Sequence, residues 1–140
     1  MEQKKTENET KKEYLQSYRY AVIAETQIKE EIDQLRMDKM FPGLVQDGMP
    51  HGPGGSDLSA YAAKLDELLI ELKDQMDKRI QLRREIVKKI EAMDSETEKA
   101  ILRYRYIHFL KWEEIAVKMS YTFRHVVRMH GRALKNFKMS

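Results

Sequence analysis

The chain has 140 residues, of which 35% are charged and 9% aromatic, with three prolines, six glycines and no cysteine. This composition is typical of a largely helical, solvent-exposed protein, and the lack of cysteine excludes disulfides and thiolate metal sites. No apolar run approaches the roughly 18 residues that a membrane-spanning helix requires, and the N-terminal residues contain no signal-peptide core. We therefore expect a soluble protein of the cytoplasm with no membrane partner.

The charge is unevenly distributed along the chain. Residues 1–94 contain 16 Lys and Arg against 19 Asp and Glu, a net charge of −3, whereas residues 95–140 contain 10 against 4, a net charge of +6. A basic segment attached to a mildly acidic one predicts that only the C-terminal part meets a polyanion.

Residues 1–12 have no apolar side chain after Met1, and we expect a disordered, solvated N-terminus. Residues 13–40 then show apolar side chains at steps of three and four, which predicts a long amphipathic helix. Its stripe consists of Tyr18, Ala21, Glu25, Ile28, Ile32 and Leu35, with Leu15 and Val22 on the flank.

A second helix is predicted from about residue 58 to 93, capped by Ser56 or Asp57. Its stripe consists of Leu58, Ala62, Leu65, Leu69, Leu72, Met76, Ile86, Ile90 and Met93, with Arg79 and Arg83 at stripe positions and Ile80 and Leu82 on the flanks. Residues 42–56 hold all three prolines and five of the six glycines. This segment is either a plain connector or a contact loop that carries Met49 and His51.

The two helices predict a long antiparallel, coiled-coil-like hairpin over residues 13–94. Each apolar stripe has only one neighbour in such a hairpin, so we expect completion by a second copy, giving a homodimer, or by another protein. The alternative is that the two stripes close on each other and the hairpin is a stalk.

Ser95-Glu96-Thr97-Glu98 matches a capping box, in which Ser95 accepts from a first-turn amide and Glu98 reaches back to the Ser95 amide. A new helix is therefore predicted to start here, and we assign residues 95–140 to a small helix-turn-helix domain.

Trp112–Phe137 contains two short helical patterns at the spacing of a helix-turn-helix. Ala116 lies where the two helices come closest, a position that requires a small side chain. Ser120 occupies the turn, where many such motifs place a glycine to reach a positive φ. The serine indicates either a strained turn or a slightly different one. The predicted core under the motif comprises Ile115, Met119, Tyr121, Val126 and Met129.

The opposite face of the second motif helix is basic, and no carboxylate occurs from Ser120 to the end. Thr122 is predicted to cap this helix and is counted among the DNA-binding residues. Arginine can pair with guanine, and a valine can touch a thymine methyl group. The residues predicted to approach base edges are Phe123, Arg124, His125, Val127 and Arg128; those predicted to contact phosphates are Arg132, Lys135 and Lys138. The alternative is a basic, solvated helix used for protein contacts.

No constellation of residues argues for catalysis. Glu113 and Glu114 are adjacent, so on a helix they point about 100° apart. The four histidines have no carboxylate or cysteine partners at ligand spacing, and we interpret His108 as structural. Phosphate-binding glycine loops and serine nucleophile motifs are missing. We therefore expect no enzymatic activity, no cofactor and no metal.

Three stretches, MDSETEKAILRYRY, LKWEEIAVKM and RALKNF, resemble region 4 of sigma factors, which reads the promoter −35 element and touches the RNA polymerase flap. The resemblance covers residues 93–137. The chain departs from the pattern at Lys111, where a serine or threonine cap is usual, at Ser120 in place of glycine, and at Phe123, where a small or polar residue is common. Nothing resembles sigma region 2, so the chain is not a complete sigma factor.

The whole chain resembles a family of small proteins from phages and prophages of Gram-positive bacteria. The matching stretches are Tyr14–Arg19, Asp47–Gly52, Ser56–Leu58 and Arg128–Lys135. The resemblance implies transcriptional regulation in the bacterial cytoplasm, akin to late-gene activators of the ArpU and RinA type.

We therefore expect a DNA-binding regulator whose partners are double-stranded DNA and, through the hairpin, RNA polymerase or a second copy. The alternatives are a DNA-packaging protein similar to a small terminase subunit, and an adaptor that binds proteins and does not touch DNA.

Overall fold

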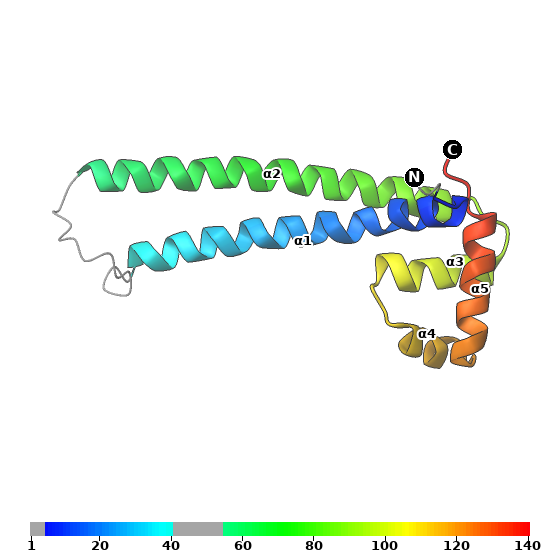
Figure 1. Cartoon of the computed structure of the whole chain (residues 1–140). Coiled ribbons are helices and arrows are strands. Elements are labelled where there is room, and N and C mark those ends of the chain that lie inside the picture. Colours follow the sequence, from blue (N-terminus) through cyan, green and yellow to red (C-terminus); the bar gives the residue numbers. More distant parts are fainter. Residues whose placement is uncertain (1–4, 41–54) are drawn as a thin grey trace. The chain divides into compact units, whose positions relative to one another are not determined.

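The structure, a computed structural model, describes residues 5–40 and 55–140. These residues form helices and no strand: α1 (Glu7–Met40), α2 (Gly55–Glu91), α3 (Glu96–Leu102), the π-helical segment η2 (Arg103–Ile107), α4 (Trp112–Met119) and α5 (Phe123–Asn136) (Figure 1). The predicted all-α class is confirmed. None of the described helices is both long and apolar enough to cross a bilayer.

The second long helix begins earlier than predicted. Because α2 starts at Gly55, Asp57 lies in its first turn and is not the capping residue. The rest of the predicted loop, including Met49 and His51, lies outside the described residues.

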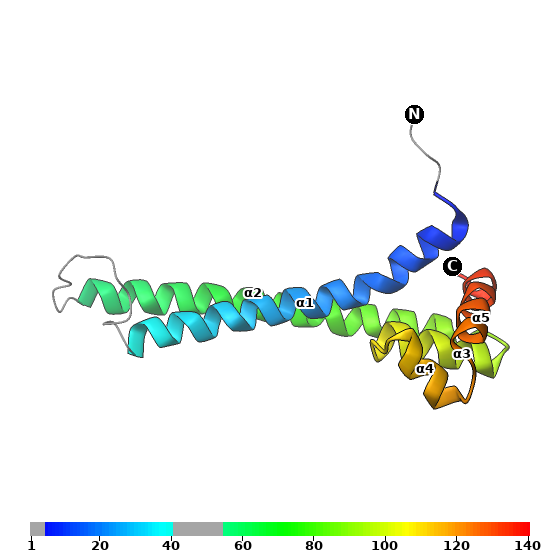
Figure 2. The same ribbon diagram turned by 60° about the horizontal axis from the view of Figure 1, so that its bottom comes forward.

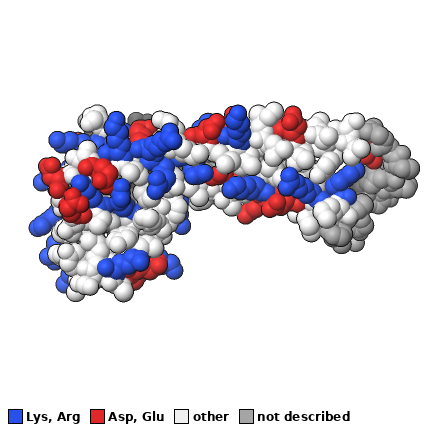
Figure 3. Space-filling model, turned by 180° about the vertical axis from the view of Figure 1, so that it is seen from behind, with Lys and Arg blue, Asp and Glu red and all other residues white. Residues whose placement is uncertain are grey.

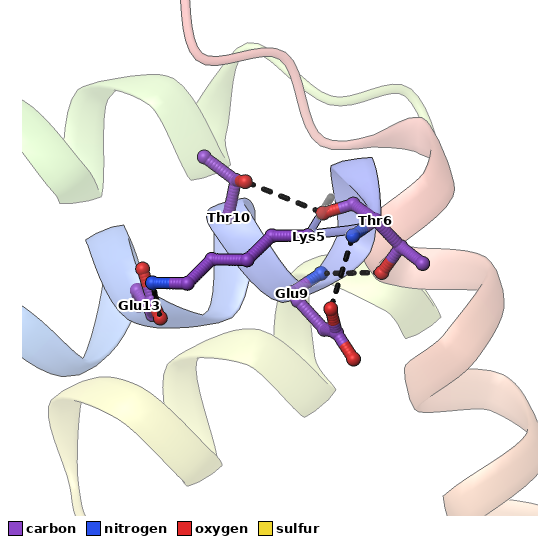
Figure 4. A network of polar contacts seen from close by, with 5 residues as sticks. All are labelled: Lys5, Thr6, Glu9, Thr10 and Glu13. Carbon is purple, nitrogen blue, oxygen red and sulfur yellow. Dashed lines mark hydrogen bonds and ion pairs between the residues drawn. The ribbon is translucent and has the colours of Figure 1, made fainter. Parts of the chain in front are cut away.

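The first helix also begins earlier, at Glu7, so the prediction of a disordered end is wrong for residues 7–12. A capping box at Thr6–Glu9 explains this start. The Thr6 hydroxyl accepts a hydrogen bond from the Glu9 amide at 3.2 Å, and the Glu9 carboxylate accepts one from the Thr6 amide at 3.0 Å (Figure 4). Two first-turn amides are thereby satisfied without any apolar residue.

The described residues divide into two compact units. The two-helix unit is Val22–Lys78, and the C-terminal unit combines Met1–Ala21 with Arg79–Ser140. The predicted domain boundary between residues 94 and 95 does not coincide with this division, because parts of α1 and α2 belong with the C-terminal helices.

In the two-helix unit, α1 and α2 lie side by side and run in opposite directions (Figures 1 and 2). Their core consists of Ile28, Ile32 and Leu68, with Leu35, Leu65 and Leu72 packed against it. The predicted stripe position Leu69 is wrong: Leu69 is 42% exposed, whereas Leu68 is 3% exposed. Both Leu68 and Leu69 satisfy a three-four spacing between Leu65 and Leu72, so periodicity could not distinguish them.

The C-terminal unit buries side chains from several helices. α1 contributes Leu15 and Tyr18; α2 contributes Ile86, Ile90 and Met93; α3 contributes Ile101 and Leu102; and the last helix and its end contribute Val126, Ala133, Leu134 and Phe137. Leu15 was predicted on the flank of its stripe but is fully buried. Along α2, Arg83 is exposed and Leu82 is half-buried, the reverse of the prediction.

The N-terminal part of α1 makes specific contacts within this unit. The Lys11 ammonium donates to the carbonyl oxygens of Leu134 at 2.9 Å and Lys135 at 3.2 Å. The Tyr18 ring stacks on Phe109 with centroids 5.5 Å apart. These contacts explain why the start of α1 belongs to the C-terminal unit.

In the part of the chain that the structure describes, two residues other than glycine adopt a positive φ of 59°, Phe109 and Ser120. At Ser120 this conformation ends α4, and the following Tyr121 amide donates to the Ala116 carbonyl at 2.9 Å. The arrangement is a Schellman-type helix end, in which glycine is usual. Of the two alternatives that the sequence left open at Ser120, the structure has the left-handed turn and not a different one. Phe109 was not anticipated, and its ring is held against Tyr18.

We predict that Leu15→Ala lowers the free energy of unfolding of the C-terminal unit by about 2–5 kcal/mol, because a fully buried leucine leaves a cavity. The measurement is chemical denaturation followed by circular dichroism and by Trp112 fluorescence. Leu58→Ala is the matched control, since Leu58 is largely exposed. A loss below about 1 kcal/mol for Leu15→Ala would contradict the assignment of α1 to this unit.

Ser120→Gly is expected to raise the free energy of unfolding by about 0.5–1 kcal/mol, since glycine adopts the left-handed region without steric cost. Ser59→Gly, at an exposed helical position of α2, should lower it by a similar amount. If thermal denaturation shows the same change in the free energy of unfolding for both substitutions, the positive φ at Ser120 carries no steric cost.

Candidate nucleic-acid interface

The start of α5 is defined by its cap. Thr122 has extended backbone angles, and its hydroxyl accepts a hydrogen bond from the His125 amide at 3.1 Å. The predicted cap is therefore confirmed, and the role of Thr122 within the structure is to start the helix. The preceding α4 begins after Lys111, whose amide donates to the Glu114 carboxylate at 3.1 Å, so the glutamate half of a capping box forms without a serine or threonine cap.

One face of α5 is buried, through Val126, His130, Ala133 and Leu134. Val126 clusters with Ile115 and Ala116 of α4, and the half-buried Trp112 and Met119 pack against this cluster. The small side chain at Ala116 thus lies where α4 and α5 meet, as predicted. Tyr121, also predicted in this core, is 37% exposed instead.

The exposed side chains of α5 include most of the predicted interface: Phe123, Arg124, Val127, Arg128, Arg132 and Lys135. His125 is half-buried, and its ring meets the edge of Tyr121 at 4.7 Å. Lys138 is exposed but follows the end of the helix at Asn136, so it extends the basic surface from the C-terminal segment.

The basic side chains of this face are not neutralised by neighbours. Within the described residues, no ion pair involves Arg124, Arg128, Arg132, Lys135 or Lys138. Figure 3 shows Lys and Arg atoms, interspersed with Asp and Glu atoms, at the end of the molecule where the C-terminal helices lie. An exposed row of unpaired cations is an arrangement that attracts phosphate.

Contacts that the sequence analysis missed hold the C-terminal end of α5. Lys11 caps the last carbonyl oxygens, where a cation also offsets the negative end of the helix dipole. The Asn136 amide donates to the Glu98 carboxylate at 2.8 Å. Ser95 accepts from the Glu98 amide at 3.3 Å, but no hydrogen bond returns from Glu98 to the Ser95 amide, so only half of the predicted capping box forms.

An open groove of about 1210 Å³ lies at this end of α5. Its lining includes Lys88, Lys135 and Lys138 together with the buried Phe137. Two of its carboxylates are already bonded within the unit, since Glu85 accepts from Tyr14 and Glu98 from Asn136. Glu7 and Asp94 also line the groove, so its charge is mixed.

His130 lies on the buried face of α5, against the Trp112 ring at 4.5 Å, and its Nε2 is hydrogen-bonded to the Tyr106 hydroxyl at 2.7 Å. Burial, with smaller contributions from the charges of Lys12 and Arg105, lowers the pKa of His130 from 6.5 to about 4. Burial also raises the pKa of Tyr106 to about 12. His130 is therefore neutral at physiological pH and serves as part of the core.

Among residues 5–40 and 55–140, no three His, Cys, Asp or Glu side chains are placed to hold a metal ion. In comparisons with known proteins, no family model, no curated protein and no solved structure matches the chain.

The low pKa of His130 predicts that acid destabilises the C-terminal unit. Between about pH 6.5 and 4 the unfolded chain binds a proton at this histidine and the folded chain does not, so stability is complete above pH 6.5 and declines below it. The loss approaches about 3 kcal/mol at pH 4. The free energy of unfolding, obtained from urea denaturation at pH 7, 6 and 5, measures this loss of stability.

His130→Gln should remove this part of the pH dependence between pH 6.5 and 5, because glutamine still offers Tyr106 a hydrogen-bonding partner but does not titrate. His108→Gln is the control at an exposed histidine and should leave the dependence intact. An unchanged pH dependence in His130→Gln would mean that other groups cause it.

Proposed function

We propose that this protein is a phage or prophage DNA-binding transcriptional regulator, in which α4 and α5 act as a helix-turn-helix and α5 enters the major groove. The observation that carries the proposal is the exposed face of α5, where Arg124, Arg128 and Arg132 project without ion-pair partners. The resemblance to sigma factor region 4 and to small phage regulators supports the same function.

The division of labour along α5 follows from position. Arg124 and Arg128 lie in the first half of the helix, which in a helix-turn-helix meets the base edges. Arg132, Lys135 and Lys138 lie further along and are assigned to phosphates, which contribute affinity without sequence information. Because Thr122 and Lys11 fix the two ends of α5, the arginines are presented on a rigid element.

The two-helix unit is assigned to oligomerisation or to contact with RNA polymerase. Its helices leave several large apolar side chains exposed, among them Leu58, Leu69 and Ile70 on α2 and Ile23 on α1. Exposed apolar side chains in such numbers favour a protein partner over a bare stalk.

Charge reversal at Arg124→Glu and Arg128→Glu together should weaken binding to a cognate duplex about thirtyfold or more, if each arginine contributes about 1–3 kcal/mol through base or phosphate contacts. Because both arginines are assigned to base edges, the preference among duplexes should fall as well. Fluorescence anisotropy on duplexes from prophage promoters at several salt concentrations measures both quantities.

Lys73→Glu with Lys78→Glu is the matched control, since it makes the same change in net charge at exposed positions of α2. It should bind DNA like the unmodified protein. Binding that is absent at low salt, or that shows no preference among duplexes, would contradict a sequence-specific regulator. Loss of DNA affinity in both double variants would show that only net charge matters.

A further inference from the structure

The exposed face of α5 carries apolar side chains as well as basic ones. Phe123 is 49% exposed and Val127 is 43% exposed, although the same helix has a well-packed buried face. These two residues are four positions apart, so they lie next to each other on one side of the helix. We call this pair the apolar ridge.

The apolar ridge runs beside a basic row. Arg124 and Arg128 have the same four-residue spacing and lie about 100° further around the helix. A ligand that faces this part of α5 therefore meets an apolar strip and two guanidinium groups side by side. The major groove of DNA offers the matching pair of features, since thymine carries an apolar methyl group and guanine carries two acceptors.

Gly131 continues the ridge one turn beyond Val127. A Cβ atom at this position would meet nothing within 4 Å, so packing among the described residues does not call for glycine. Glycine destabilises a helix interior relative to alanine, and one common reason for its use is the close approach of a ligand to the backbone. The ridge thus ends in a stretch of α5 that a groove wall can approach closely.

We infer that Phe123 and Val127 read thymine methyl groups in the major groove, so that α5 selects sites in which thymines lie beside guanines. This inference rests on the proposed function and specifies its substrate. A protein partner would also cover the ridge, but the two adjacent arginines and the absence of any carboxylate after Glu114 favour the polyanion.

The test uses the full-length protein and duplexes that it retains from a randomised pool. Each retained duplex is compared with a copy in which deoxyuridine replaces thymidine, which removes only the methyl groups. Affinity is expected to fall about fourfold for each contacted methyl group. Because uracil can also alter duplex shape, the comparison is repeated with a variant protein.

In the double variant Phe123→Ala with Val127→Ala, the affinities for the thymidine duplex and for its deoxyuridine copy should be about equal. Both side chains are exposed, so the fold should persist, and circular dichroism checks this. Val117→Ala is the matched control, because Val117 is 80% exposed but lies on α4 outside the reading helix. The Val117→Ala variant should prefer the thymidine duplex over its deoxyuridine copy as strongly as the unmodified protein does.

Equal affinity of the unmodified protein for the two duplexes would overturn the inference, as would a double variant that keeps the original preference for the thymidine duplex. Either result leaves DNA binding itself intact. A protein that retains no duplex from the pool would instead overturn the proposed function, and the inference with it, so the two failures are distinguishable.

Discussion

α5 is held at both ends by side chains from outside the helix, and the orientation of the basic face depends on this. Thr122 supplies an acceptor for the first turn, and Lys11 supplies a donor for the last carbonyl oxygens, from a position far away in the sequence. Between these ends, Val126, His130 and Ala133 anchor the helix in the core. A helix fixed in this way can present only its opposite face to a ligand.

His130 is a polar side chain buried in the core of the C-terminal unit. His130 is hydrogen-bonded to Tyr106 and packs against Trp112, so its ring is satisfied without a charge. Desolvation makes protonation costly at this site, which links the stability of the C-terminal unit to pH. Replacing it by an apolar residue would leave the buried Tyr106 hydroxyl without this partner.

The domain assignment illustrates what local patterns cannot provide. Residues 2–12 lack apolar side chains, yet residues 7–12 are helical because of the Thr6–Glu9 capping box and because Lys11 reaches α5. The capping box was visible in the sequence as Thr-Glu-Asn-Glu, so a search for caps would have moved the helix start. The contact of Lys11 with α5 joins residues more than a hundred positions apart, and no local signal indicates it.

The order of the helices, the all-α class, the cap at Thr122 and the small residue at Ala116 could be predicted from the chain alone. Each depends on interactions within a few residues, where propensity and periodicity act directly. Three features could not be predicted from the chain alone. They are the burial of Leu68 in place of Leu69, the exposure of Tyr121, and the packing of the two ends of the chain in one unit. They depend on which surfaces meet after folding, and several arrangements satisfy the local pattern equally well. Packing in three dimensions selects among them.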